Sequence, residues 1–399
     1  WRTSQVERAV TGVIFGQQVA FRRRLAVAVC YAAMFMLGFT ISLLGPSLPG
    51  IAGRTGVTLP QAGFLFALFS GGSILATLLV ARLNDHPIRR WTFLAGALLM
   101  AAGLWSMANS GTFALAGAAI AVTGLAMSTE GTVPNAVFMD LYRERAGGAL
   151  NQLHVSAGIG SFVGPLVLAV VYRSGGDYTV AYRLAAALMM IVAVSWAASL
   201  PPSPVRAPGA TPRLERALLL PLLLVFTLAL FYTGTEQVLA GWLFTYGSDA
   251  LGLIATVASL ATSLLWGAVL VGRLLAVVAL RRASNARLVQ LGLAIAFVGV
   301  LLILGGRGWP PLFWVGVGLV GLGFGPIFPT SLALASELAP DRSGAAGSIV
   351  VASGSIGAMT LPLAAGSLIP SLGVAGSIAL ALVPIALMSV LSLVLSRRV

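Results

Sequence analysis

The chain has 399 residues, of which 58% are hydrophobic and only 9% are charged, and its mean hydropathy is +0.97. Since a soluble domain carries about 25% charged residues, these charges cannot cover a water-facing surface, and the composition predicts an integral membrane protein. The basic residues are all arginines, because the chain has no lysine, and they give it a net charge of +13. These arginines lie between apolar runs, which argues against nucleic-acid binding.

The first 24 residues are predicted to form a basic tail or a short interfacial helix. Val6, Val10, Val13 and Ile14 recur at near-helical spacing, and Arg22–Arg24 follow them. Apolar and basic residues in this arrangement suit a membrane surface. The apolar stretch that comes next is too long for a signal peptide and has no evident small-residue cleavage site, so we interpret it as the first spanning helix.

Apolar runs of about 20 residues, each long enough to cross the ~30 Å hydrocarbon core of a bilayer, recur along the rest of the chain. They predict an all-α integral membrane fold with twelve transmembrane helices in two pseudo-symmetric six-helix bundles, over 25–200 and 217–399. The proline- and arginine-rich stretch 201–216 is predicted to be the cytoplasmic linker between them. The predicted helices are 25–48, 60–83, 91–109, 112–142, 148–173, 180–200, 217–247, 254–279, 287–305, 311–336, 343–369 and 372–396.

The arginines are distributed unevenly over the predicted loops. If both termini are cytoplasmic, the opposite side receives only Arg54, Arg173, Arg183 and Arg307, and nearly all the others fall on the cytoplasmic side. This distribution follows the positive-inside rule. The sequence therefore predicts a multi-pass protein of the cytoplasmic (inner) membrane with both termini in the cytoplasm.

The second half of the chain repeats the plan of the first. Gly124–Pro165 and Gly321–Pro362 each comprise an apolar helix, a short charged turn and a helix rich in small residues. Such a repeat is typical of transporters built from two related halves around a central site. Positions that match between the halves are predicted to be scaffold, and positions that differ are predicted to carry function. The differing pairs are Glu130 and Ile327, Asn151 and Ser348, and His154 and Val351.

Twelve helices in two halves with a basic linker resemble the major facilitator superfamily. The loop 81–90 is similar to the signature that follows the second helix of that superfamily: Leu83, Asp85, Arg89 and Arg90 match it, while both of its glycines are replaced. The resemblance implies transport by alternating access and a monomeric protein. It also implies that Asp85 latches the two halves together, near the start of the eleventh helix, in the outward-facing state.

Shorter motifs resemble one branch of the superfamily. Leu150–His154, with the glycines that follow, is similar to the fifth helix of the fucose–proton symporter-like group, and Tyr232–Glu236 is similar to its seventh helix. This resemblance implies a sugar substrate. The first helix here lacks the acid of that group, and Glu130 is shifted by one residue from the family position, which is about 100° of helical rotation.

Two acids lie nearest to mid-span. An acid at bilayer depth costs several kcal/mol unless it is paired, protonated or bathed in cavity water. Glu130 and Glu236 are therefore predicted to be ion-coupling residues that hold a proton or a sodium ion. The alternative for each is a protonated acid that is hydrogen-bonded between helices. No other cofactor and no metal is expected.

Polar and aromatic side chains on the same helices are predicted to bind the substrate. Asn151 and His154 are three residues apart and share a helix face, and aromatic rings such as Trp242 stack on sugar rings. The alternatives are polar contacts within the bundle, core packing, or an interfacial aromatic belt. The predicted substrate-binding set is Asn135, Asn151, His154, Gln237, Trp242, Tyr246 and Trp266.

Arg273 lies inside the predicted eighth helix and has three candidate roles: pairing with an acid, binding the substrate, or snorkelling to the cytoplasmic face. A further set of charged residues occupies the cytoplasmic helix ends, where repeat symmetry predicts gate or structural salt bridges. These gating residues are Asp85, Arg89, Asp140, Arg145, Glu337 and Arg342.

The sequence shows no phosphate loop, no metal-spaced His/Cys cluster and no nucleophile–base constellation, so it predicts neither an enzyme nor an ATP-driven pump. The prediction is a secondary active transporter of a small solute, a sugar, coupled to protons or sodium. The alternative is a proton-coupled exporter of amphipathic drugs or lipids, since the spacing from Gly160 to Gly164-Pro165 resembles the fifth helix of drug–proton antiporters. A non-transporting receptor is a third hypothesis. The expected partners are a small-molecule substrate and the lipid bilayer.

Overall fold

The structure is a computed structural model that describes residues 2–84, 88–142, 146–199, 219–279, 284–338 and 343–396. Within those ranges the regular structure is helical throughout. The elements are α1 (Arg2–Thr55), α2 (Leu59–Ala62), α3 (Phe64–Asn84), α4 (Arg89–Asn109), α5 (Phe113–Tyr142), α6 (Ala146–Arg173), α7 (Tyr178–Ala198), α8 (Leu219–Thr245), a π-helical turn (Tyr246–Ala250), α9 (Ala255–Ala279), α10 (Asn285–Gly305), α11 (Pro310–Phe324), α12 (Ile327–Leu338), α13 (Ser343–Ser367), α14 (Ile369–Ala379) and α15 (Leu382–Ser396).

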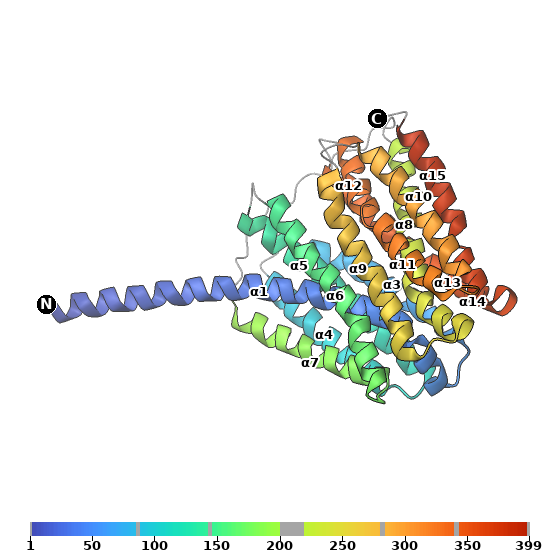
Figure 1. Ribbon diagram of the computed structural model, residues 1–399. Helices are drawn as coiled ribbons and strands as arrows, with labels where there is room; N and C mark the ends of the chain where they lie inside the picture. The colour runs from blue at the N-terminus through green and yellow to red at the C-terminus, as the bar shows by residue number, and fades with distance from the viewer. Residues whose placement is uncertain are drawn as a thin grey trace.

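The described ranges contain 11 helices that are long and apolar enough to cross a membrane, or up to 12 when the bent pair α14 and α15 counts as one span. This confirms the predicted all-α membrane fold. Figure 1 shows α4, α5, α6 and α7 packed around the bundle part of α1, and α8, α10, α13 and α15 gathered on the other side. The two halves therefore form two helical bundles side by side. The predicted linker 201–216 lies outside the described residues.

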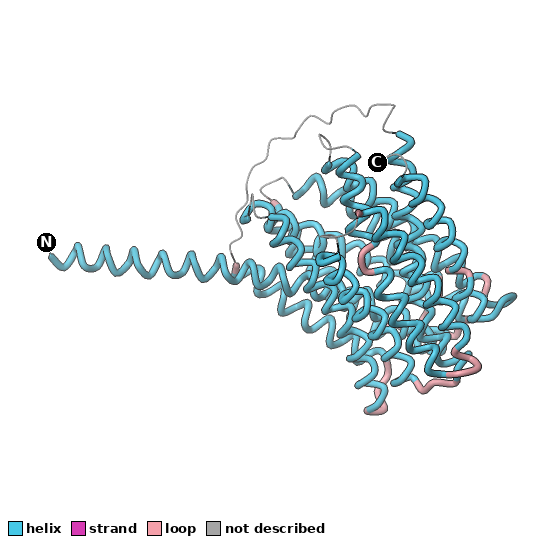
Figure 2. Tube along the Cα trace, turned by 45° about the horizontal axis from the view of Figure 1, so that its top comes forward, coloured by secondary structure: helices cyan, strands magenta, loops and turns pink. Residues whose placement is uncertain are grey.

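Four predicted helices differ from the observed ones. The predicted helix 60–83 is divided at Gly63 into α2 and α3. The first helix runs unbroken from Arg2 to Thr55 instead of covering 25–48, so the described part of the N-terminal segment continues α1 beyond the bundle (Figures 1 and 2). The predicted helix 311–336 is interrupted at Gly325-Pro326, because proline has no N–H to donate and crowds the preceding turn. The predicted helix 372–396 is instead the pair α14 and α15, bent by 42°.

Small residues bring equivalent helix pairs of the two halves into backbone contact. A Cβ atom at Gly160 of α6 would collide with the carbonyl oxygen of Phe35 in α1, and a Cβ atom at Gly357 of α13 would collide with that of Leu230 in α8. Close approach of this kind replaces the hydrophobic effect as the source of helix association inside a bilayer. The same correspondence relates α3–α5 to α9–α11, at Gly124 against Phe69 and at Gly321 against Leu265.

Charged residues at the arginine-rich ends tie helices together within each half. Nη1 of Arg89, at the start of α4, donates to Oδ2 of Asp140 in α5 at 2.7 Å, and the two side chains are only 4% and 12% exposed. At the corresponding place in the second half, Nδ2 of Asn285 donates to Oε1 of Glu337 at 2.8 Å, and this pair is exposed. The repeat thus preserves the tie between the two helices but buries an ion pair only in the first half.

We predict that Gly160→Ala destabilises the protein, because the added methyl group has no space against α1, and overpacking costs about 1–3 kcal/mol. Gly318→Ala in α11 is the matched control: a Cβ atom there meets nothing within 4 Å. Alanine is also the better helix former by about 0.5–1 kcal/mol. Thermal unfolding in detergent should show a lower midpoint for Gly160→Ala and an unchanged or higher one for Gly318→Ala. Equal midpoints for the two variants would contradict the close packing of α6 on α1.

We also predict that Arg89→Gln lowers the free energy of unfolding by about 3–5 kcal/mol, because it leaves the carboxylate of Asp140 buried without a charge partner. The double variant Arg89→Gln/Asp140→Asn should recover part of this loss. Asn285→Ala, at the exposed equivalent, should cost about 1 kcal/mol. Unfolding midpoints of the purified variants test the series, and a loss at Asn285 as large as that at Arg89 would disprove the assigned difference in burial.

Candidate functional site

A cavity of about 370 Å³ lies between the two halves. Helices α1, α3, α5 and α6 line one wall, and α8, α9, α12 and α13 line the other. This volume falls in the range of about 300–1,000 Å³ that is typical of small-molecule sites. A cavity lined by four helices from each of two repeated halves is the place where a transporter of this construction binds its solute.

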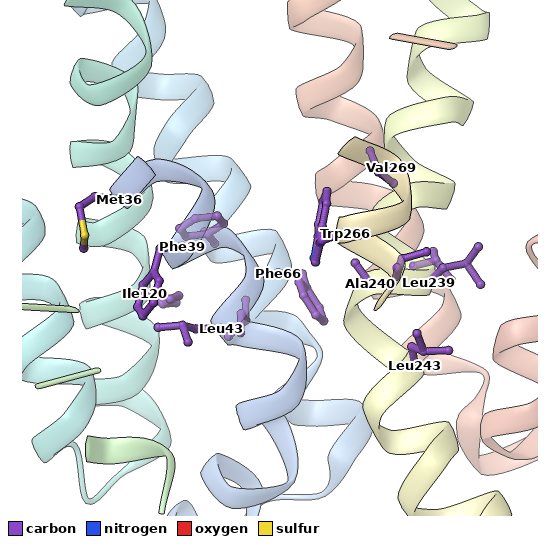
Figure 3. Close-up of a cluster of buried hydrophobic side chains, with 14 of the residues drawn as sticks. Met36, Phe39, Leu43, Phe66, Ile120, Leu239, Ala240, Leu243, Trp266 and Val269 are labelled. Carbon is purple, nitrogen blue, oxygen red and sulfur yellow. The ribbon is translucent and has the colours of Figure 1, made fainter. Parts of the chain in front are cut away.

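At the arginine-poor end of the cavity the two halves are in close contact. A Cβ atom at Gly45 of α1 would lie 2.6 Å from the carbonyl oxygen of Ala240 in α8, and one at Gly241 would lie 2.5 Å from the ring of Phe66 in α3. Figure 3 shows Phe66 and Trp266 of α9 one above the other, between the helices of the two halves. These contacts leave no room between α1, α3 and α8, so the cavity is closed at this end.

Toward the arginine-rich end the lining reaches Asn135 on α5 and Arg273 on α9. Asn135 lies seven positions before Tyr142, the last residue of α5, and Arg273 lies six positions before Ala279, the last residue of α9. Both residues are therefore ~10 Å inside the bundle. Asn135 and Arg273 therefore lie nearer to this end, and the aromatic ring of Phe66 lies at the closed end.

Glu236 on α8 is the centre of the charged part of the lining. Its Oε1 accepts a hydrogen bond of 2.6 Å from the hydroxyl of Tyr232, one turn earlier on the same helix. Nη2 of Arg273 lies 3.9 Å from the same oxygen atom, which is an ion pair but is too long for a hydrogen bond. Sequence reasoning identified Glu236 and left the role of Arg273 open, and the structure brings the two side chains together.

Four lining residues carry buried polar atoms that have no hydrogen-bond partner: Oδ1 of Asn135, Oγ1 of Thr233, Nε1 of Trp266 and Nε of Arg273. Buried polar atoms are nearly always paired in proteins. These four atoms are not exposed to the cavity, so a solute could complete them only after their side chains turn toward it. His154 and Gln237 line the same cavity.

Glu130 lies outside this cavity lining. Its side chain is fully buried in the first half. Oε1 accepts a hydrogen bond of 3.3 Å from the hydroxyl of Thr129, and Oε2 has no partner. The neighbouring Gly131 does line the cavity, so Glu130 is directed away from it, about 100° around α5. Its predicted role in ion coupling stays a prediction.

Three of the predicted substrate-binding residues also lie outside the cavity lining. The indole N–H of Trp242 donates to the carbonyl oxygen of Pro362 at 3.1 Å, and the hydroxyl of Tyr246 donates to that of Ile303 at 3.1 Å. Both rings are fully buried in packing contacts, and Asn151 is exposed elsewhere on α6. In this conformation none of these side chains reaches a solute in the cavity, so their predicted role is not tested by the fold.

The predicted gating residues are only partly described. Asp85, Arg145 and Arg342 lie outside the described residues. Arg89, Asp140 and Glu337 make the contacts within each half given above, and none of those contacts joins the two halves. The predicted structural salt bridge is thus observed for Arg89 and Asp140, while a gating role for the set stays a prediction.

Sequence reasoning missed several small polar residues of the lining, among them Ser70, Ser73, Ser161 and Ser355. An alignment of the two halves could have identified them, because equivalent positions, 196 or 197 residues apart, line opposite walls of the cavity. These pairs are Leu37 and Thr233, Ile41 and Gln237, Ser70 and Trp266, Ser73 and Val269, Gly131 and Phe328, His154 and Val351, Ala157 and Gly354, Gly158 and Ser355, and Ser161 and Ala358.

The fold is similar to those of several solved transporters. A bacterial homologue of the human lysosomal transporter Spinster, in an inward-facing and unoccupied conformation, superimposes with a TM-score of 0.78 at 13% identity, over 94% of this chain and 97% of that one. The nucleoside transporter NupG gives 0.73 at 14% identity, over 94% and 98%. The peptide transporter POT in complex with sulfate gives 0.75 at 15% identity, over 93% and 94%.

Sequence comparison shows similarity to curated transporters. Sodium-dependent glucose transporter 1 of Danio rerio is 23% identical over 396 residues, which is 88% of this chain and 65% of that protein. Sodium-dependent glucose transporter 1A of Mus musculus is 26% identical over 137 residues, 34% of this chain and 32% of that protein. The chain thus spans less than two thirds of the length of these relatives. The family model described as Major Facilitator Superfamily matches residues 30–346, so this chain belongs to that superfamily, a family of carriers and not of enzymes.

Proposed function

We propose that the protein is a secondary active transporter that moves a small hydroxyl-rich solute, a sugar or polyol, by alternating access. The observation that carries the proposal is the polar part of the cavity lining, which combines the carboxylate of Glu236, the half-buried guanidinium of Arg273 and the side chains of His154, Gln237 and Thr233. A sugar hydroxyl both donates and accepts, so one ring with several hydroxyls can bond to several of these groups. The relatives named as glucose transporters support the same substrate class.

The proposed coupling site is Glu236. An ionisable residue at membrane depth marks an ion or proton pathway by default, and this carboxylate lies on the cavity wall beside Tyr232 and Arg273. A proton or a sodium ion bound there would link solute movement to an ion gradient. Glu130, buried with an unpaired oxygen in the other half, is the second candidate for this role.

The proposed location is the cytoplasmic membrane, with both termini and the arginine-rich helix ends on the cytoplasmic side. In that orientation the cavity is closed toward the extracytoplasmic side. The closure is made by two contacts, Gly45 with α8 and Phe66 with Gly241. The structure then corresponds to an inward-facing arrangement. Both walls of the cavity come from one chain, which supports transport by a monomer.

We predict that Glu236→Gln abolishes gradient-driven accumulation of the solute in proteoliposomes but preserves exchange between labelled and unlabelled solute, because an amide keeps the shape of the side chain and cannot change its charge. Asp249→Asn, which alters an exposed acid beyond the end of α8, is the control and should behave as wild type. Uptake of a panel of hexoses, sugar acids and polyols is measured with an imposed pH or sodium gradient. If the panel gives no flux with the wild-type protein, the proposal of sugar transport is wrong.

A second candidate function is the export of amphipathic compounds. The observation that favours it is the share of the lining that comes from aliphatic and aromatic side chains, particularly at the closed end. These include Met34, Leu37, Ile41, Leu44, Phe66, Phe69, Met127, Val269, Leu270 and Phe328.

Asn135→Ala separates the two candidates. We predict that it weakens binding of a sugar about 2- to 10-fold, since a typical hydrogen bond contributes about 0.5–1.5 kcal/mol, and that it leaves the binding of an apolar amphiphile unchanged. Isothermal titration with purified protein measures both. Tighter binding of amphiphiles than of any sugar, unaffected by Asn135→Ala, would favour export.

A further inference from the structure

The guanidinium of Arg273 lines the cavity, and not all of its N–H groups are hydrogen-bonded. Its side chain is 32% exposed, yet its Nε atom is buried and has no hydrogen-bond partner. Nη2 approaches Glu236 only to 3.9 Å, and the Oε1 atom that it faces already accepts the 2.6 Å hydrogen bond from Tyr232. The acid is thus satisfied mainly by Tyr232, and the arginine has hydrogen-bonding capacity left over.

Repeat symmetry indicates that Arg273 is not part of the scaffold. The position equivalent to it, with the offset that relates Trp266 to Ser70, is Thr77, whose hydroxyl donates to the backbone oxygen of Ser73 at 2.8 Å. Helix α3, which is the equivalent of α9 in the first half, therefore packs without a charge at this position. Helix packing does not require this arginine, and the residue lies on the wall of a cavity. We therefore expect it to bind a ligand.

The balance of charge in the cavity defines that ligand. Among the described lining residues, Glu236 is the only carboxylate and Arg273 the only arginine, so the pair is neutral when the acid is ionised. When a proton binds to Glu236, the cavity holds one uncompensated cation with free N–H groups. A planar guanidinium matches a carboxylate, which can accept two parallel hydrogen bonds from it.

We propose that the transported solute is a sugar acid, such as a uronate, whose carboxylate binds Arg273 while a proton occupies Glu236. This deepens the function proposed above and rests on it. One proton and one carboxylate enter together: the proton neutralises Glu236, the solute carboxylate replaces it as the partner of Arg273, and the sum of charges in the cavity stays the same. The step is therefore electroneutral, and proton and solute bind cooperatively.

The surroundings of Glu236 favour a proton over a metal cation. A sodium ion at its carboxylate would lie close to the guanidinium of Arg273, and like charges repel strongly at these distances in a low-dielectric site. The other ionisable groups that face the pair are Tyr232 on α8 and His154 on α6. The remaining helices of the lining face it with residues that carry no charge, such as Phe328 on α12, Val351 and Gly354 on α13.

The experiment compares glucose, glucuronate and the neutral methyl ester of glucuronate as ligands of the purified full-length chain, by titration calorimetry at about pH 5.5 and about pH 8. A panel of other uronates and their parent hexoses covers differences in ring stereochemistry. We expect the wild type to bind one uronate at least about tenfold more tightly than its parent hexose and its methyl ester at the lower pH, and to lose about tenfold at the higher pH.

The variants assign the effect to the two residues. Glu236→Gln should bind the uronate tightly at both pH values, because Arg273 is then free of its acid. Arg273→Gln should lose the preference for the uronate over its parent hexose, and Arg273→Lys, which keeps the charge, should retain part of the preference. Unfolding midpoints confirm that each variant is folded.

Two outcomes separate this inference from the function on which it rests. Equal binding of hexose and uronate, unchanged in Arg273→Gln, would overturn the inference and leave sugar transport in place. Absence of binding for every sugar and sugar acid, with a folded wild-type protein, would overturn both. Tight binding of the uronate at both pH values by the wild type would reject the role of Glu236 as the proton site.

Discussion

Close backbone contact between helices is the constraint on which the rest of this structure depends. Apolar surface gives helices no preference for one another over lipid, so their association needs van der Waals contact at short range. Glycines at the crossings of α6 with α1 and of α13 with α8 supply it. Because the two crossings are equivalent in the repeat, both halves adopt the same arrangement, and the space left between them becomes the central cavity.

The repeat fixes where side chains enter the cavity but not what they are. Nine pairs of equivalent positions line opposite walls, and in most of them one member is polar where the other is apolar. His154 faces the cavity from one half where Val351 does from the other, and Trp266 corresponds to Ser70. The frame of the cavity is therefore symmetric and its lining is asymmetric.

The ionisable residues divide into two groups by the same logic. Arg89 and Asp140 join α4 to α5 where Asn285 and Glu337 join α10 to α12, so these contacts follow the repeat and serve the scaffold. Glu236 and Arg273 have no charged counterparts in the first half, where Thr40 and Thr77 occupy the equivalent positions. An ion pair whose acid is buried is a costly way to stabilise a helix bundle. Its presence at only one of two equivalent places favours a functional explanation.

The sequence by itself determined the membrane fold, the number and approximate positions of the spans, the repeat, and Glu236 as an acid at membrane depth, because hydrophobic length and repetition are properties of the chain alone. It did not determine the breaks at Gly325-Pro326 and between α14 and α15. Only the tertiary structure decided which face of each helix meets the cavity. It placed Trp242 in packing against Pro362, directed Glu130 away from the solute and brought Arg273 to Glu236. The physical reason is that nearly every span is apolar around most of its circumference, so the rotation of a helix is fixed by its neighbours and not by its own pattern of residues.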